Sequence, residues 1–269
     1  MATGLHRRCA AYPMVDMKKL IYILACLIPL VCMPSCVGQK DDPEDEPVDN
    51  PEEPQTPVDE SEMGSCLVLD FTGTWCVNCP RMHTAIESAM EQRPGLIVPV
   101  AVHCLSLDPM MLAPVSDDLA RRFGVSAYPS VVVNFDPLTL FTAASTDLLL
   151  AHCDKSRAAR GKAAALEIKL SEKGAEYVCV QATAARDGDY TLHLLRLEDG
   201  IVEPQTGAGE DYVHNDVLRE WTEAPEAFSG RRAGDVFSAD FKADLPAGSG
   251  KLVAIVCRGG IVDNVLSTN

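Results

Sequence analysis

Residues 70–80 read DFTGTWCVNCP, and this segment is the most informative one about the fold. It overlaps the end of an apolar run, CLVLDF at 66–71, and leads into residues 80–92, where apolar side chains recur at helical spacing. Cys76 and Cys79 therefore stand where a buried strand gives way to a helix. Unpaired N–H groups and the helix dipole at such an N-terminus stabilise a thiolate. The pattern predicts that Cys76 attacks and that Cys79, one turn on, resolves the mixed disulfide.

Other chemistries for this pair lack their partners in the sequence. A zinc site requires a second ligand pair at finger-like spacing, and none is present. Haem attachment requires a histidine directly after the second cysteine, where Pro80 stands. His83 lies on the same helix face as Cys79, but a lone helix histidine is more often solvated or packed than metal-bound. We expect no metal and no other cofactor.

Strands and helices alternate around the CxxC segment. Five further segments have strand or helix patterns: strands at 96–103, 130–135 and 138–144, and helices at 115–123 and 146–160. The order is βαβ, a helix, then ββα, which predicts an α/β layer fold for residues 64–161.

The hydrophobic period changes after about residue 162. Leu166, Ile168 and Leu170 alternate with polar residues, as in a half-buried strand. Further strand patterns, separated by Gly, Asp and Pro turns, lie at 175–185, 189–198, 235–245 and 251–258. We expect an all-β sandwich over residues 162–269 that folds independently, because the joining segment RAARGK is polar.

The motif Trp75-Cys-x-x-Cys-Pro after a strand, with Asp70 six residues before Cys76, resembles the thioredoxin superfamily. The resemblance implies that Asp70 is buried beneath the disulfide and assists proton transfer to the resolving cysteine. An unpaired carboxylate in an apolar run is costly, which fits such a role; satisfaction by backbone donors at a strand end is the alternative. Val77-Asn78 replaces the Gly-Pro of thioredoxin itself, and the usual lysine near the aspartate is not apparent. The direction of electron flow is therefore open.

A second segment extends this resemblance. FGVSAYPS, residues 123–130, is similar to the loop that carries a cis-proline opposite the CxxC in the superfamily. The resemblance implies that Pro129 is cis and that the neighbouring backbone edges pair with a substrate chain. An ordinary trans proline at the start of a strand is the alternative.

The N-terminal region has the pattern of an export signal. Residues 17–19 supply a charged start and residues 20–33 an apolar run that is short for a membrane span. The run ends in MPSC, which resembles a bacterial lipobox and implies a signal peptide over 17–36 with Cys36 lipidated. An uncleaved anchor is the alternative. Residues 1–16 look like an upstream extension.

Acidic residues are concentrated just after this signal. Residues 41–62 hold eleven Asp or Glu and no Lys or Arg, within a chain whose net charge is -16. Together with five prolines they predict an extended tether over 37–63. The tether is either a plain spacer or part of a signal for delivery to the outer membrane and the cell surface. No basic run with interleaved aromatic residues occurs, so we expect no nucleic-acid partner.

The seven cysteines that remain beyond the anchor are an odd number, so they cannot all pair. We interpret Cys66, Cys104 and Cys179 as small buried hydrophobic residues. Cys179 and Cys257 fall in predicted strands and are either two separate thiols or a cross-sheet disulfide.

A narrower resemblance covers nearly the whole mature chain. The lipobox, FTGTWCVNCP and a later YVHNDVLR at 212–219 are similar to the Omp-twenty-eight-related outer-membrane lipoproteins of Bacteroides-type bacteria. That resemblance implies a thioredoxin-like domain followed by an immunoglobulin-like sandwich, a periplasmic or surface-facing location, and a link to adhesion. The residues alone give no role for His214 or Asn215.

Two functions follow as hypotheses. The first is a membrane-anchored dithiol-disulfide oxidoreductase of the cell envelope that acts on protein thiols or disulfides. Trp75, the CxxC pair, Asp70 and Pro129 would form its catalytic site. The second is a surface binding or adhesion protein that uses the thioredoxin-like domain as a scaffold, since a fold alone never fixes function.

Overall fold

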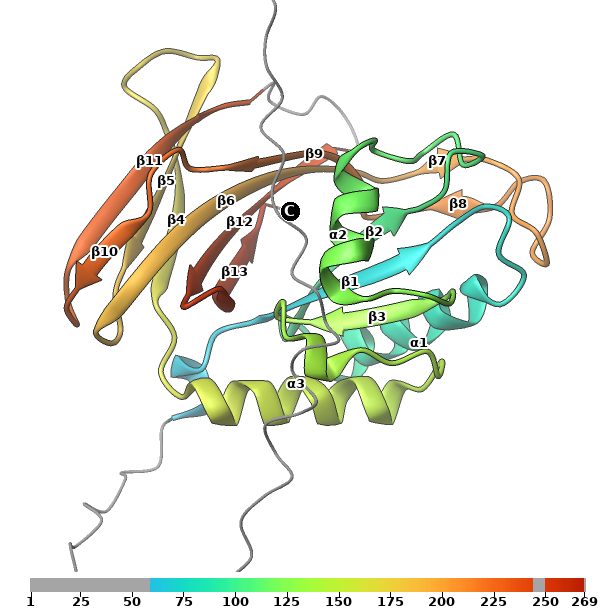
Figure 1. The fold of residues 1–269 in the computed structure, drawn as a ribbon, viewed down its shortest axis with the longest axis horizontal. Helices are drawn as coiled ribbons and strands as arrows, with labels where there is room; N and C mark the ends of the chain where they lie inside the picture. The colour runs from blue at the N-terminus through green and yellow to red at the C-terminus, as the bar shows by residue number, and fades with distance from the viewer. Residues whose placement is uncertain (1–58, 244–249, 269) are drawn as a thin grey trace, which may run out of the picture. The chain divides into compact units, whose positions relative to one another are not determined.

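The computed structural model describes residues 59–243 and 250–268 (Figure 1). The expected upstream extension, the signal peptide with Cys36 and residues 37–58 of the tether lie outside the described residues. Residues 59–63, the end of the expected tether, are folded: a short 3-10 helix, η2 (Glu60–Glu62), begins where the Asp59 side chain accepts from Ser61 N. Arg157 donates to the carbonyl oxygen of Glu60 at 2.8 Å. Among the described residues, no helix is both long and apolar enough to cross a membrane.

The N-terminal half, residues 59–161, contains the predicted alternation of strands and helices. Its elements are β1 (Cys66–Thr72), α1 (Cys79–Gln92), β2 (Ile97–His103), α2 (Val115–Phe123), β3 (Ser130–Val133), η3 (Pro137–Thr139) and α3 (Thr146–Arg160). β1 pairs parallel with β2 and antiparallel with β3. This is the βαβ and antiparallel-strand arrangement of a thioredoxin-like fold.

The prediction of a strand at 138–144 is wrong. Pro137 has no N–H for a ladder, and the Asp136 side chain accepts from Leu138 N at 2.9 Å, so the chain turns into η3. Only Phe141 keeps a strand-like contact, as an isolated bridge to Val131.

The C-terminal half, residues 162–268, is built from strands. They are β4 (Ala165–Leu170), β5 (Tyr177–Thr183), β6 (Gly188–Glu198), β7 (Ile201–Val202), β8 (Val213–His214), β9 (Val217–Glu223), β10 (Phe228–Arg231), β11 (Val236–Lys242), β12 (Gly250–Arg258) and β13 (Ile261–Ser267). The sequence predicted β4, β5, β6, β11 and β12. It did not single out β9, β10 or β13.

One sheet runs through both halves. Its strand order is β13-β12-β6-β9-β2-β1-β3, with β10 added beside β6. The junction is the parallel contact between β2 and β9, where Ala101 N donates to the carbonyl oxygen of Asp216 at 2.8 Å. A second sheet, β11-β5-β4, belongs to the C-terminal half alone. Figure 1 shows β6 and β12 between that second sheet and the N-terminal half.

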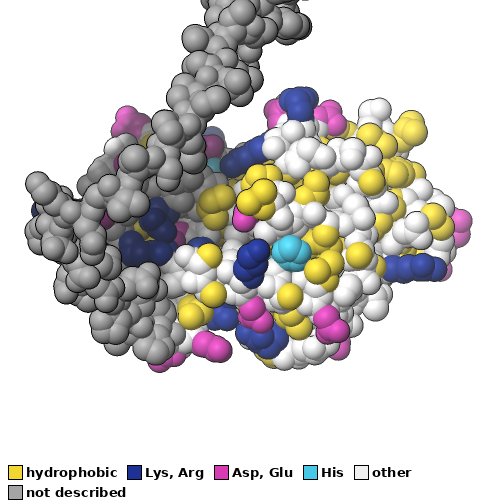
Figure 2. All heavy atoms as spheres, turned by 60° about the horizontal axis from the view of Figure 1, so that its bottom comes forward, with side chains coloured by type: hydrophobic (Ala, Val, Ile, Leu, Met, Phe, Trp, Pro, Cys, Tyr) yellow, Lys and Arg dark blue, Asp and Glu magenta, His cyan; other side chains and the backbone are white. Residues whose placement is uncertain are grey.

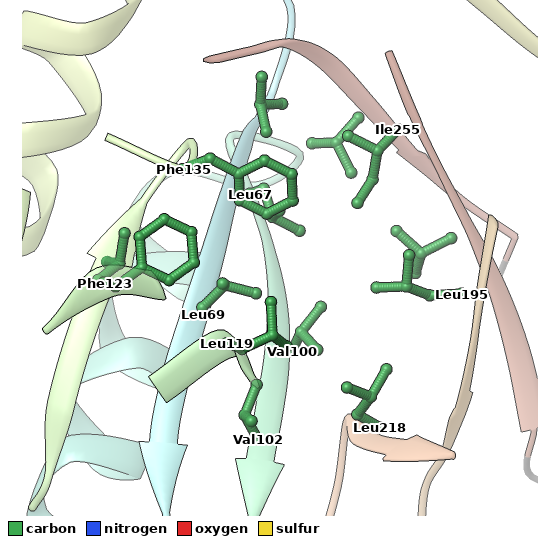
Figure 3. Close-up of a cluster of buried hydrophobic side chains, with 14 of the residues drawn as sticks. Leu67, Leu69, Val100, Val102, Leu119, Phe123, Phe135, Leu195, Leu218 and Ile255 are labelled. Atoms are coloured by element: carbon green, nitrogen blue, oxygen red, sulfur yellow. The ribbon is translucent and has the colours of Figure 1, made fainter. Parts of the chain in front are cut away.

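The largest apolar cluster also spans both halves (Figure 3). Leu67 and Leu69 of β1 share it with Leu195 of β6 and Ile255 of β12, all fully buried. Other faces of β6 and β12 bury Leu192, Leu194 and Val256 against the second sheet. The strands β6 and β12 are therefore covered on both sides, and one of those sides is supplied by the N-terminal half.

A third cluster lies on the opposite face of β1. Cys66 and Val68 alternate along β1 with Leu67 and Leu69 and pack with Met82 of α1 and Leu149 of α3.

On the face turned forward in Figure 2, basic, acidic and hydrophobic side chains are interspersed, without an extended basic stripe.

Candidate active site

The CxxC segment forms a disulfide at the start of α1. Cys76 and Cys79 are joined, with their Cα atoms 5.5 Å apart. Cys79 is the first residue of the helix and Pro80 follows it, in the position where a missing N–H costs nothing. The Cys76 residue is 5% exposed and Cys79 is 0% exposed. Of the two, Cys76 is the one nearer the surface.

Trp75 anchors the turn that precedes this disulfide. Its Nε1 donates to the carbonyl oxygen of Cys104 at 3.1 Å, and its ring packs edge-on against Tyr128 with centroids 5.1 Å apart. Thr74 N donates to Oδ2 of the buried Asp108 at 2.7 Å. The turn before Cys76 is thus held by groups from the segments after β2 and before β3.

Pro129 lies immediately before β3, and the Tyr128–Pro129 peptide bond is cis. Pro129 is buried, and the Trp75–Tyr128 contact links its loop to the CxxC turn. Tyr128 connects these two parts of the site. A second cis bond, Ala113–Pro114, precedes α2.

Asp70 lies on the face of β1 that is turned toward α1. Because side chains alternate along a strand, it shares that face with Cys66 and Val68, which pack against α1 and α3. Its side chain is 3% exposed, and Oδ2 lies 3.0 Å from Nε2 of His83. The carboxylate therefore faces the imidazole of His83, and no backbone donor among the described residues reaches either of its oxygens.

His83 is the partner that the sequence did not assign. It lies one helical turn after Cys79, with Nε2 also 3.2 Å from Thr72 Oγ1 and Nδ1 2.7 Å from the hydroxyl of Tyr212. Burial by itself would lower the pKa of His83. Attraction to the adjacent Asp70 carboxylate, with the charges of Glu87 and Asp216, outweighs burial and raises the pKa above its ordinary value of 6.5.

A segment of the C-terminal half covers the CxxC turn. We call residues 203–212, between β7 and β8, the strap. Gln205 Nε2 donates to the carbonyl oxygens of Cys76 at 2.9 Å and Gly73 at 3.3 Å, and Thr206 N donates to Thr74 O at 2.8 Å. At Gly207, an added Cβ would lie 2.9 Å from the carbonyl oxygen of Val77. The strap is therefore in direct backbone contact with the redox segment.

The strap leads into YVHNDVLR, and the structure gives its residues positions around the site. His214 is buried, packs edge-on against His103 at 5.3 Å, and has a pKa lowered to about 4 by burial. His103 Nδ1 lies 2.9 Å from Asp108 Oδ2. Asn215 Oδ1 accepts from Gly200 N at 3.0 Å.

The five other cysteines within 59–243 and 250–268 are not in disulfides. Cys66 and Cys104 are buried, as predicted, and burial raises the pKa of Cys104 to about 12. Cys179 is only partly buried, because it lies on the outer face of β5 between the inward Val178 and Val180. Cys257 belongs to the other sheet and is not paired with Cys179.

Within 59–243 and 250–268, no group of three or more His, Cys, Asp or Glu side chains is arranged to hold a metal ion. The structure places Trp75 directly before the CxxC pair and links Pro129 to them through Tyr128, while Asp70 meets α1 at His83, one turn after Cys79. It adds His83, Gln205 and Tyr212. Spacing to Cys79 marked His83 in the sequence, whereas Gln205 stands in a polar loop with no motif.

Comparison with protein-family models and with curated proteins finds no match. Solved structures do match. HBP35 of Porphyromonas gingivalis is 16% identical and aligns over 76% of this chain and 74% of its own, with a TM-score of 0.58. Protein AGR_C_4864 of Agrobacterium tumefaciens is 15% identical over 76% of this chain and 93% of its own, with a TM-score of 0.53. At these identities the likeness shows a shared mixed α/β fold only.

Proposed function

We propose that the chain is a thiol-disulfide oxidoreductase of the bacterial cell envelope, which alternates between the Cys76–Cys79 disulfide and its dithiol form. The observation that carries the proposal is the disulfide at the N-terminus of α1, with the buried Asp70–His83 pair on the adjoining face of β1. A thiolate of Cys76 would be stabilised by the helix N-terminus, and Asp70 would take the proton of Cys79. Protein thiols or disulfides are the substrates.

Trapping of mixed disulfides tests this function. Cys79→Ser should accumulate partners linked to Cys76, whereas Cys76→Ser should accumulate few, because the remaining sulfur is enclosed. Non-reducing gels and the rate of iodoacetamide alkylation across pH provide the readout. If Cys76 alkylates with the pKa of a free cysteine and neither variant captures a partner, the oxidoreductase proposal is wrong.

The proposed location is the outer membrane, through a lipid on Cys36. Its support is the lipobox-like MPSC after the apolar run. Cys36→Ser should move the protein from the membrane pellet into the soluble fraction. Retention of the variant in the pellet with an unprocessed N-terminus would identify the apolar run as an anchor instead.

A second candidate is a binding or adhesion protein with an immunoglobulin-like β part, in which the disulfide is structural. One observation favours it: Cys76 is only 5% exposed, and the strap contacts the backbone beside it. The trapping experiment separates the two, since a structural disulfide would neither exchange with a partner nor open at the potentials of cellular dithiols.

A further inference from the structure

We propose that His83 and Tyr212 relay protons between the buried Asp70 and the surface, so that the C-terminal half supplies part of the acid–base chemistry of the redox site. The inference rests on the proposed oxidoreductase function and assigns a role to two residues of that same site. His83 and Tyr212 act through Asp70, so they are positioning and relay residues, not residues that touch the reacting sulfurs.

The geometry of the imidazole is the first support. Both ring nitrogens have polar partners: Nε2 lies 3.0 Å from Oδ2 of Asp70 and 3.2 Å from Thr72 Oγ1, and Nδ1 lies 2.7 Å from the Tyr212 hydroxyl. A ring that contacts a carboxylate on one side and a hydroxyl on the other can take a proton at one nitrogen and release one from the other. Tyr212 is partly exposed, so its hydroxyl can connect this ring to solvent.

A pocket beside these groups is the second support. It has a volume of about 50 Å³, and its lining includes Asp70, His83, Tyr212 and the apolar Ile86 and Pro99. That space suffices for at least one water molecule. Neither buried carboxylate oxygen of Asp70 has a hydrogen-bond donor among the described residues, and Oδ2 meets His83 Nε2 as an ion-pair contact only. A water in the pocket would supply such a donor.

Acidic groups surround His83 on each element that faces it. They are Asp70 on β1, Glu87 on α1 and Asp216 before β9, and Asp216 is itself paired with Lys251. This surrounding charge raises the pKa of His83 in spite of its burial. The imidazole therefore keeps its proton to a higher pH than an unperturbed histidine does.

The relay operates during resolution of a mixed disulfide. Cys79 gives its proton to Asp70, and its sulfur attacks Cys76 Sγ. The Cys76–Cys79 bond forms, the bond between Cys76 and the substrate sulfur breaks, and the substrate leaves as a thiolate with that electron pair. Asp70 passes its proton to Nε2 of His83, His83 releases one from Nδ1 to the Tyr212 oxygen, and the phenolic proton passes to solvent. The reducing equivalents stay with the substrate, so no further oxidant is required.

Stopped-flow reaction of the reduced protein with oxidised glutathione separates the two steps. The first glutathione is released when Cys76 attacks and the second when Cys79 resolves. We expect His83→Gln to slow resolution about tenfold or more with attack unchanged, and Tyr212→Phe to slow it less. In the unsubstituted protein the resolution rate should rise with pH through an inflection above 6.5 that His83→Gln lacks. His152→Gln and Tyr177→Phe, away from the site, serve as controls.

The outcomes separate the relay from the function on which it rests. If the unsubstituted protein releases no glutathione, the oxidoreductase function and the relay are both wrong. If it resolves normally and the two variants keep its rate and pH profile, the relay alone is wrong. Equal slowing of attack and resolution would also overturn it, since that indicates a structural effect. Tyr212→Phe keeps the ring in its packing, so it decides the question even if His83→Gln fails to fold.

Discussion

The side-chain amide of Gln205 donates a hydrogen bond of 2.9 Å to the backbone carbonyl oxygen of Cys76, across 129 residues of sequence. The same Nε2 reaches the carbonyl oxygen of Gly73 at 3.3 Å. One residue of the C-terminal half therefore satisfies two carbonyl groups of the redox turn. The residue itself is 2% exposed, so water cannot readily replace it.

Gln205→Ala should lower the free energy of unfolding of the oxidised protein by about 1–3 kcal/mol, because it removes two hydrogen bonds and leaves each carbonyl oxygen with a single backbone donor, Cys76 N for Gly73 and Cys79 N for Cys76. It should also speed alkylation of Cys76 in the reduced protein, since the strap is no longer tied to the turn. Urea unfolding and iodoacetamide kinetics measure the two effects. Gln92→Ala, at an exposed position of α1, is the control. Equal stability of the two variants would show that the amide contributes nothing.

Gly207→Ala should displace the strap from Val77. The glycine has a φ of +85°, which costs any other residue about 1 kcal/mol, and its new Cβ would lie 2.9 Å from the Val77 carbonyl oxygen. Gly200→Ala is a matched control, because its φ is +75° and nothing lies within 4 Å of an added Cβ. We expect Gly207→Ala to lose about 1–3 kcal/mol more than the control. If thermal or urea unfolding shows the same loss of stability in both variants, the loss comes from the positive φ alone and not from contact with Val77.

The shared core predicts that the two halves unfold together. Leu195→Ala, in the C-terminal half, should lower the free energy of unfolding by about 2–5 kcal/mol, because its side chain lies in a core formed with β1. The unfolding transitions reported by Trp75 in the N-terminal half and by Trp221 in the C-terminal half should shift equally. Fluorescence of Trp221→Phe and Trp75→Phe backgrounds reports each half separately. Leu170→Ala, 79% exposed on β4, is the control. Two separated transitions would instead support the independent domains expected from the sequence.

A fragment of residues 163–269 provides a second test of the same core. Without the N-terminal half, it exposes the faces of β6 and β12 that cover Leu67 and Leu69. We expect it to show no cooperative unfolding transition by circular dichroism. A sharp transition for the fragment alone would contradict the single core.

His193 should make the protein sensitive to acid. Burial, with a smaller contribution from the charge of Arg122, lowers its pKa to about 4, against 6.5 in the unfolded chain. Between these values the unfolded chain binds a proton that the folded chain does not. Stability should therefore fall as pH drops from 6.5 toward 4, by on the order of 1–3 kcal/mol from this residue.

His193→Leu tests this pH dependence. It should reduce the slope of unfolding free energy against pH between 4 and 6.5 by an amount that corresponds to about one bound proton. This holds whatever the effect of the substitution on stability at pH 7. His152→Leu, at a partly exposed position of α3, is the control for the loss of a histidine. If both variants keep the original slope, His193 does not carry the acid sensitivity.

Local patterns determined the N-terminal half and its redox pair. The position of Cys76 and Cys79 between a strand and a helix follows from a change of hydrophobic period, from strand to helix, within about twenty residues. The alternation of side chains along β1 places Asp70 on a buried face. The same local chemistry was misread once, at 138–144, where Pro137 and the capping Asp136 outweighed the apolar residues. Short-range signals of this kind are physical constraints on the backbone, so a sequence displays them directly.

The surroundings of the cysteine pair depend on long-range contacts, which local patterns do not reveal. Gln205 and Tyr212 reach Cys76 and His83 because β9 adds to the edge of β2, a contact between segments about a hundred residues apart. No periodicity encodes which edge a strand will join. That choice depends on the combined burial of both halves in one core, so the partner of Asp70 and the strap over Cys76 could not be read from the chain.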